Sequence, residues 1–348
     1  MKFGLVSERH LCRTSGMRFC LFLCSISFLY AQNETLALGK SLQGEKHTRP
    51  IEPKGKTVQD LEPIHPGVIA YGEFLYWIPF GLDLDYAASG NGANFTATKK
   101  HFVEYDWQSG FKAALGWRFP TKWDLIAVFT YLKPHGSDEV TASTVTSAFD
   151  KVFGALYQSA TSQVDLDYLI GDLEMGRRKF IFRNYIMRFI LGFRGAWIKQ
   201  DWKNTFTQLS GASTISRNQW NAKGGGGRAG VSLQWDSPFY IGLLSKLTFS
   251  LLIMREELQY RQTSFSLQNI NTHFKQNKLV PTIDFELGLI WEKFFTESWG
   301  MNLSMSYQIT TWWNLNEKLR QGNALSFDEK TAENLYLQGL TAHAGVFF

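Results

Sequence analysis

Hydrophobic and polar residues alternate along most of the chain from Gly67 to its last residue. The final segment is the clearest case, because its hydrophobic residues share one face of a strand. That face carries Tyr336, Leu340, Ala342, Ala344, Val346 and Phe348. A strand that continues to the terminal residue needs neighbours to hold it, since free chain ends usually fray. The pattern therefore predicts an all-β protein whose C-terminus is part of a sheet.

The alternating segments group into four hairpins with short polar connections. They cover residues 109–131, 162–199, 228–260 and 283–309. In the first hairpin, a turn centred at Thr121 places Trp117 opposite Leu125 and Arg118 opposite Asp124.

In the second hairpin we expect the turn at residues 176–178, a glycine followed by two arginines. A turn there places Asp165 opposite Arg188. The outward face of the first strand then carries Val164, Leu166, Tyr168 and Ile170. Asp165 and Asp167 point inward in this arrangement.

Long polar segments separate the hairpins, at residues 134–160, 200–222, 261–277 and 314–333. Short and long connections therefore alternate, as in barrels whose turns lie in the periplasm and whose loops lie outside the cell. One more strand must precede residue 109 to keep this order, so we predict a single long strand over residues 68–86, bent at Pro79. The count is ten strands, and the chain length also permits twelve or fourteen.

A closed transmembrane barrel accounts for these patterns better than a soluble β-sandwich. The faces between the hydrophobic positions are mostly small or neutral with spaced charges, which suits an enclosed polar lumen. Aromatic residues, 15% of the chain, fit the two lipid–water interfaces. The predicted interface residues are Trp117, Phe119, Trp123, Trp197, Trp235, Trp291 and Phe348. We therefore predict a closed antiparallel transmembrane β-barrel over residues 67–348, with short periplasmic turns and long extracellular loops.

The N-terminal residues indicate export. Residues 17–31 combine a basic start, an apolar run and a small final residue, so we predict a signal peptide over residues 1–31. Met17 is an alternative start, which would make residues 1–16 an upstream extension. Residues 32–66 are polar and contain prolines, and we predict a flexible extension there.

Removal of the signal peptide limits the chemistry of the mature chain. Cys12, Cys20 and Cys24 all precede residue 31, so we expect no disulfide, thiolate metal site or cysteine nucleophile. Part of the net charge of +5 is lost with the signal peptide, which leaves no basis for nucleic acid as a partner. The histidines are not at metal-ligand spacing, so we expect no metal and no other cofactor.

A run of four glycines, Gly224–Gly227, lies between Lys223 and Arg228. A phosphate-binding loop would end in Gly-Lys-Ser/Thr before a helix, and neither feature is present. The run predicts a flexible strand entry or a bend in the barrel wall.

Several short sequences occur in order between residues 70 and 348. They are Gly72-Glu-Phe-Leu-Tyr-Trp77, Tyr105-Asp-Trp-Gln-Ser-Gly-Phe111, Gly192-Phe-Arg-Gly-Ala196, Gly288-Leu-Ile-Trp291 and Leu335-Tyr-Leu-Gln-Gly-Leu340. Together they resemble the Legionella-type major outer membrane protein family of pore-forming proteins, which also has members among amoeba-associated chlamydiae. The resemblance implies a pore in the outer membrane of a Gram-negative-type bacterium, and it implies no catalytic residues.

The charged residues on the polar faces are the candidate functional residues. They are Lys112, Arg118, Asp124, Asp165, Asp167, Arg188, Arg194, Arg228, Asp284 and Glu286. One interpretation is a field of mixed charge that selects solutes, and the other is pairing across strands in a filled barrel. Pairing is favoured for the two opposed pairs of the first and second hairpins. Arg194 and Arg228 have no acid directly opposite and are predicted to face open water.

Three functions fit this barrel. The first is passive diffusion of ions and small solutes, and the second is a structural or adhesive surface barrel whose loops bind host or other partner molecules. The third is an enzyme, for which His135, Asp138 and Glu139 share one predicted loop. No catalytic motif accompanies them, so we expect no enzymatic activity.

Two partners are expected for such a barrel. They are outer-membrane lipid and, through the C-terminal strand ending at Phe348, the barrel-assembly machinery. The sequence leaves a homo-oligomer open.

Overall fold

The computed structural model describes residues 66–90, 97–148, 156–182, 184–237, 241–264, 270–296, 299–320 and 329–348. The predicted signal peptide, residues 1–31, and residues 32–65 of the predicted extension lie outside this part of the chain. None of the described residues forms a helix that is long and apolar enough to cross a membrane.

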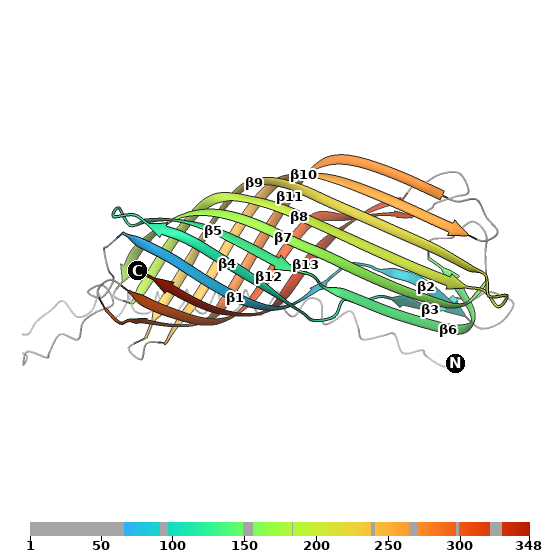
Figure 1. The fold of residues 1–348 in the computed structure, drawn as a ribbon, viewed down its shortest axis with the longest axis horizontal. Coiled ribbons are helices and arrows are strands. Elements are labelled where there is room, and N and C mark those ends of the chain that lie inside the picture. Colours follow the sequence, from blue (N-terminus) through green and yellow to red (C-terminus); the bar gives the residue numbers. More distant parts are fainter. Residues whose placement is uncertain are drawn as a thin grey trace, which may run out of the picture. The chain divides into compact units, whose positions relative to one another are not determined.

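The described residues form thirteen strands of one antiparallel sheet (Figure 1). The strands are β1 (Gly67–Phe80), β2 (Asp85–Gly90), β3 (Ala97–Phe102), β4 (Gln108–Arg118), β5 (Trp123–Leu132), β6 (His135–Ser147), β7 (Tyr157–Phe182), β8 (Tyr185–Thr207), β9 (Ser213–Asp236), β10 (Ile241–Ser264), β11 (Ile270–Phe294), β12 (Gly300–Arg320) and β13 (Glu329–Phe347).

Ten of these strands close into a ring. Neighbours follow the order β7-β5-β4-β1-β13-β12-β11-β10-β9-β8, and the pairing of β7 with β8 closes the ring. The last described strand, β13, pairs with the first, β1, so that Ile69 lies opposite Phe347. Every strand of the ring therefore has a neighbour on each side, as a wall surrounded by lipid requires. The predicted ten-strand antiparallel barrel is confirmed.

Three short strands extend one end of this ring. β6 continues β5 alongside β7, and the β2–β3 hairpin pairs with β6 through β2. The prediction of one continuous strand over residues 68–86 is wrong, because β1 ends at Phe80 and β2 begins at Asp85. Pro79 stays within β1, and the break follows at Gly81, whose φ of 82° is rarely adopted by residues with a side chain.

The turn predicted at residues 176–178 is also wrong, because β7 and β8 pair continuously through this segment. Gly176 faces the interior, where an added Cβ would lie 2.3 Å from Arg188 Nε. The glycine therefore makes room for a guanidinium group and not for a turn. The resulting register places Asp165 opposite Asp201 instead of Arg188.

The polar segments predicted as long loops are largely strand. Residues 200–222 form the end of β8 and the start of β9, and residues 134–160, 261–277 and 314–333 likewise include strand ends. Strands β7 to β11 have 23 to 26 residues, whereas about 10 residues cross a bilayer. These strands therefore continue beyond the membrane, and their polar outer residues reflect contact with water.

The outer face of the ring is apolar over the height of a bilayer. Its most exposed side chains include Phe193 at 70% and Ile253 at 68%. On β8 the apolar band runs from Tyr185 to Trp197, and roughly twelve residues at ~3.3 Å each, tilted by ~40°, span about 30 Å. The seven predicted interface aromatics all lie on this outer face, with Trp197 at one end of the band and the others near the short turns.

The glycine run lies in the middle of β9, so it is not a strand entry. Gly226 faces the interior, where a Cβ would lie 1.9 Å from the carbonyl oxygen of Leu251. Gly227 faces outward, and a Cβ there would meet no atom within 4 Å. The neighbouring strand therefore approaches the run closely on its inner side, as in a curved barrel wall.

We expect Gly226→Val to destabilise the barrel and Gly227→Val to leave its stability unchanged. Overpacking of a filled interior costs about 1–3 kcal/mol, whereas a valine on the outer wall meets only lipid or detergent. Thermal unfolding of both variants in detergent, followed by circular dichroism, measures the difference. An equal loss of stability in the two variants would contradict crowding on the inner side alone.

Candidate functional site in the barrel interior

At the height of the apolar band, the interior of the ring holds ionisable side chains from eight strands. Alternation places them inside, because their neighbours in the chain, such as Leu173 and Phe193, point outward. We call this set the charge belt. It consists of Glu73, Lys112, Asp124, Asp172, Glu174, Arg188, Arg194, Arg228, Lys246, Asp284 and Glu286.

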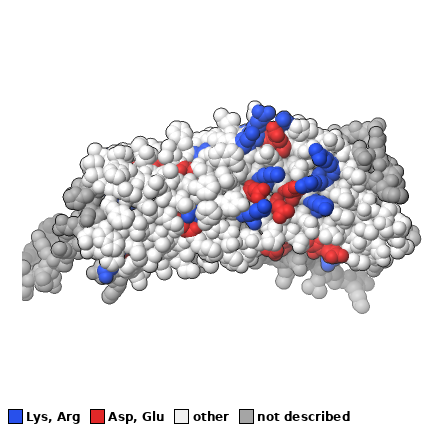
Figure 2. Space-filling model, viewed as in Figure 1, with Lys and Arg blue, Asp and Glu red and all other residues white. Residues whose placement is uncertain are grey.

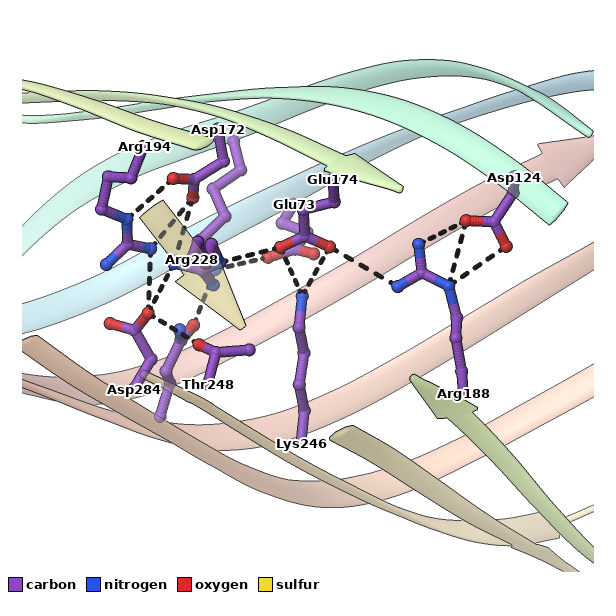
Figure 3. A network of polar contacts seen from close by, with 12 residues as sticks. Glu73, Asp124, Asp172, Glu174, Arg188, Arg194, Arg228, Lys246, Thr248 and Asp284 are labelled. Atoms are coloured by element: carbon purple, nitrogen blue, oxygen red, sulfur yellow. Dashed lines mark hydrogen bonds and ion pairs between the residues drawn. The ribbon is translucent and has the colours of Figure 1, made fainter. Parts of the chain in front are cut away.

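Two arginines share two aspartates at the centre of the charge belt (Figure 3). Arg194 donates from Nε and Nη2 to the two carboxylate oxygens of Asp172, at 2.7 and 2.9 Å. Its Nη2 also lies 2.8 Å from Asp284 Oδ2, which accepts hydrogen bonds from Arg228 at 2.8 Å and from the Thr248 hydroxyl at 3.0 Å. Arg194 and Arg228 are only 5% and 6% exposed, so their charges depend on these partners.

A second group surrounds Glu174 (Figure 3). Its Oε1 lies 3.2 Å from both Lys246 Nζ and Arg228 Nε, and its Oε2 lies 3.5 Å from Arg188 Nη1. Arg188 also reaches past β7 to β5, where its Nε lies 3.1 Å from both carboxylate oxygens of Asp124. One carboxylate therefore links three cations from β8, β9 and β10.

A third group lies on the opposite wall of the ring. Lys112 Nζ lies 3.0 Å from Glu73 Oε2 and donates to Gln308 Oε1 at 2.6 Å. His343 lies beside the same carboxylate, with Nδ1 3.3 Å from Glu73 Oε1 and Nε2 3.2 Å from Asn302 Oδ1. The three groups together give the belt both signs of charge around its circumference.

A layer of large apolar side chains fills the interior next to the charge belt. We call it the apolar layer, and it includes Trp77, Leu132, Tyr168, Ile170, Ile198, Leu252, Trp312 and Leu337. Trp312 donates from Nε1 to the Tyr168 hydroxyl at 3.3 Å. These residues belong to β12 and β7, which are opposite each other in the ring. Their contact therefore spans the full width of the lumen.

Cations of the belt stack on aromatic rings of the apolar layer. The guanidinium carbon of Arg194 lies 5.8 Å from the centre of the Trp312 ring, and Lys112 Nζ lies 5.2 Å from that of Trp77. Cation–π attraction at such distances is strengthened where water is excluded. The two layers therefore form one packed unit.

Two small cavities lie beside these layers. A cavity of 40 Å³ is lined by Arg194, Arg228 and Tyr168, and a cavity of 160 Å³ lies between Arg188 and His343. A single water molecule needs about 10–15 Å³ of such space, so the cavities have room for a few waters and for about ten, respectively.

The structure places seven of the ten predicted lumen residues in the charge belt. They are Lys112, Asp124, Arg188, Arg194, Arg228, Asp284 and Glu286. Arg118 lies nearer the short turns, with its guanidinium carbon 5.9 Å from the centre of the Phe347 ring. It is opposite Asp124 in the strand register, as predicted, but Arg188 forms the ion pair with that aspartate.

The prediction that Asp165 and Asp167 line the lumen is wrong. Asp165 is exposed on the outer face of β7, and Asp167 lies 3.5 Å from the exposed Lys133. The interior face of this strand carries Val164, Leu166, Tyr168 and Ile170, each at most 2% exposed. Because the interior is apolar at this height, the hydrophobic side of β7 does not mark the side that faces lipid.

The prediction that Arg194 and Arg228 face open water is wrong as well. Both are buried, and they pair with Asp172, Glu174 and Asp284. Asp172 lies directly opposite Arg194 in the register of β7 and β8, but the turn predicted at residues 176–178 gave a different register. Asp284 lies on β11, so a comparison of directly opposed residues does not reveal its contact with Arg194.

Four members of the charge belt are not among the lumen residues predicted from the sequence. They are Glu73, Asp172, Glu174 and Lys246. Asp172 and Glu174 continue the alternation of Tyr168 and Ile170, so the correct orientation of β7 would have identified them.

The three residues considered for an enzyme do not converge. His135 faces outward, with Nδ1 2.8 Å from Gln108 Nε2. Asp138 accepts a hydrogen bond from the Tyr86 hydroxyl at 2.9 Å. Residues three apart in a strand point to opposite faces, so His135 and Asp138 cannot act on one substrate atom.

Comparison with known proteins identifies the family. The family described as Legionella pneumophila major outer membrane protein precursor matches residues 70–348. The chain belongs to this family. Membership places it in the outer membrane of a Gram-negative bacterium, as predicted. A search of curated proteins finds no match.

Similar solved structures include outer-membrane proteins of several functions. The outer membrane protease OmpT from Escherichia coli has 9% identity and a TM-score of 0.41, over 81% of this chain and 96% of that one. The toluene transporter TodX from Pseudomonas putida has 10% identity and a TM-score of 0.31, over 84% and 92%. The attachment invasion locus protein Ail of Yersinia pestis has 10% identity and a TM-score of 0.21, over 81% and 98%.

We expect Asp172→Ala to lower the free energy of unfolding by about 3–5 kcal/mol, because it removes the carboxylate that accepts two hydrogen bonds from the buried Arg194 and leaves that guanidinium group with Asp284 alone. Asp167→Ala, on the outer face of the same strand, is the matched control and should cost at most about 1 kcal/mol. Guanidinium chloride unfolding of the detergent-solubilised variants measures both values. Similar losses in the two variants would show that the interior pair is solvated.

Proposed function

We propose that the protein is a narrow outer-membrane channel for passive diffusion of ions and small polar solutes, closed in the conformation described above. The charge belt is the observation that supports this function. A barrel interior filled with apolar residues would be at least as stable as one with buried ion pairs. Ionisable groups at membrane depth commonly mark a path for ions or solutes. Membership of the family agrees with this proposal, since the sequence resemblance implies a pore.

Two barriers lie in series along the proposed path. From the end with the short turns, the 160 Å³ cavity leads to the charge belt, and the apolar layer follows. Passage requires that Tyr168 and Trp312 separate and that ion pairs of the belt exchange partners. Lys246 is suited to such an exchange, because its side chain is 25% exposed and lies opposite Glu286 while it pairs with Glu174.

A closed structural or adhesive barrel is the second candidate. The contact of Tyr168 with Trp312 across the whole lumen favours it, because a permanently filled interior needs no gate. The strand ends that extend beyond the apolar band would then present the surface that partners recognise. Conductance distinguishes the two candidates.

The proposal includes no catalytic step. It keeps outer-membrane lipid as one partner and the barrel-assembly machinery as another, recognised through β13 and the exposed Phe348 that follows it. The apolar band of the ring supports the first of these partners.

We expect Trp312→Ala to raise single-channel conductance in planar bilayers at least severalfold, because it removes the side chain that meets Tyr168 across the lumen. Trp197→Ala is the matched control, since it removes an exposed tryptophan from the outer wall. The control should conduct like the wild type. Circular dichroism confirms that each variant retains its strands.

Two results would reject the channel. One is the absence of current from both the wild type and Trp312→Ala when both are folded, which would favour the structural barrel. The other is an equal rise in conductance in Trp197→Ala, which would show that the current does not pass through the apolar layer.

A further inference from the structure

Just beyond the apolar band, the outer wall of β8 to β11 carries many basic side chains. The strand register aligns its outward-facing residues in four rows across the four strands. Counted from the lipid side outward, the first row is Trp197, Lys223, Arg255 and Asn277, and the second is Lys199, Asn221, Glu257 and Lys275. The third row is Asp201, Gln219, Gln259 and His273, and the fourth is Lys203, Arg217, Arg261 and Asn271. We call these sixteen residues the basic patch.

The basic patch has an excess of positive charge. It contains seven lysines and arginines but only two carboxylates, Asp201 and Glu257. Asp201 pairs with Arg217, and Glu257 lies 3.1 Å from Lys275 and 3.7 Å from Arg255. Burial raises the pKa of Asp201, but hydrogen bonds from neighbouring side chains outweigh it and lower that pKa, so the group is ionised at neutral pH. The excess therefore remains after both carboxylates are counted.

Several of these cations are direct neighbours on adjacent strands. Lys203 lies opposite Arg217, which lies opposite Arg261. Lys223 lies opposite Arg255. Like charges directly opposite one another destabilise a sheet, and the two carboxylates of the patch offset only part of this repulsion. A bound anion would remove the repulsion.

The basic patch does not continue onto β7. The same rows continue onto β7 at Leu169, Asp167, Asp165 and Gln163, which include two acids and no base. In Figure 2, the charged side chains of the visible face gather in one band, where Lys and Arg lie among Asp and Glu, next to an almost uncharged wall. The excess of positive charge therefore ends at the border between β8 and β7.

The position of the basic patch indicates which anion it would meet. Its first row follows directly after the exposed, lipid-facing Ile253 and Leu279, and it begins with the exposed Trp197. Tryptophans at the edge of an apolar band lie at the level of lipid headgroups. An anion bound at this height can therefore belong to a lipid whose acyl chains lie against the wall below.

We propose that the basic patch binds the phosphate-bearing headgroup of a glycolipid in the outer leaflet of the membrane. Arginine and lysine provide strong, charge-assisted hydrogen bonds to phosphate oxygens. The five amide side chains among them can donate to and accept from sugar hydroxyls. They are Gln219, Asn221, Gln259, Asn271 and Asn277. This binding is independent of the channel function.

The test compares two triple variants of the full-length protein in uncharged detergent. The patch variant is Lys203→Gln, Lys223→Gln and Arg261→Gln. The control is Lys122→Gln, Lys179→Gln and Lys293→Gln, which removes the same charge from exposed sites near the short turns. We expect the patch variant to bind bis-phosphorylated lipid A about 100-fold more weakly than the wild type, since each cation near an anionic surface contributes about fivefold. The control should bind lipid A with an affinity within about twofold of that of the wild type, because its three lysines lie outside the basic patch.

Two further ligands separate the lipid from a free anion. Dephosphorylated lipid A with the same acyl chains should bind the wild type as weakly as the phosphorylated form binds the patch variant. Inorganic phosphate at millimolar concentration should not displace lipid A. Unchanged affinity of the folded patch variant, an equal loss in the control, or full displacement by inorganic phosphate would each overturn the proposal. The conductance of the patch variant is expected to equal that of the wild type, so the two proposals fail separately.

Discussion

The width of a ten-strand ring is the constraint on which the rest of this structure depends. A barrel of about eight strands is filled by its own side chains, and here two more strands still allow opposite walls to meet. Tyr168 and Trp312 contact each other from opposite sides of the ring. Every inward side chain at this height must therefore pack against another or pair with one. The apolar layer satisfies the first condition and the charge belt satisfies the second.

Exclusion of water from so narrow an interior explains the form of the charge belt. A buried arginine without a partner would be strongly destabilising, so each shares carboxylates with its neighbours. Arg194 takes Asp172 from the adjacent strand and Asp284 from three strands away, which ties distant parts of the wall together. The outer face of the ring meets lipid and water instead of other side chains. Lipid covers an apolar band, and water covers the polar strand ends beyond it.

Alternation in the sequence was sufficient to predict the closed ring, the strand count and the outward faces of β4, β5 and β8. It failed on β7, because the residues from Val164 to Ile170 are hydrophobic toward the interior and not toward lipid. Gly176 resembled a turn but makes room for Arg188. Ion pairs between strands that are not neighbours depend on the tilt and closure of the whole barrel, and no local pattern encodes them.

Permeation through the wild-type protein tests the central claim most directly, namely that side chains from opposite walls close the lumen. Liposome swelling with a neutral disaccharide measures whether a solute of that size passes, without an effect of solute charge. We expect liposomes that contain the folded protein to swell no faster than protein-free liposomes, because the contact of Tyr168 with Trp312 spans the lumen from opposite walls. Swelling that increases with the amount of inserted protein would contradict a closed interior.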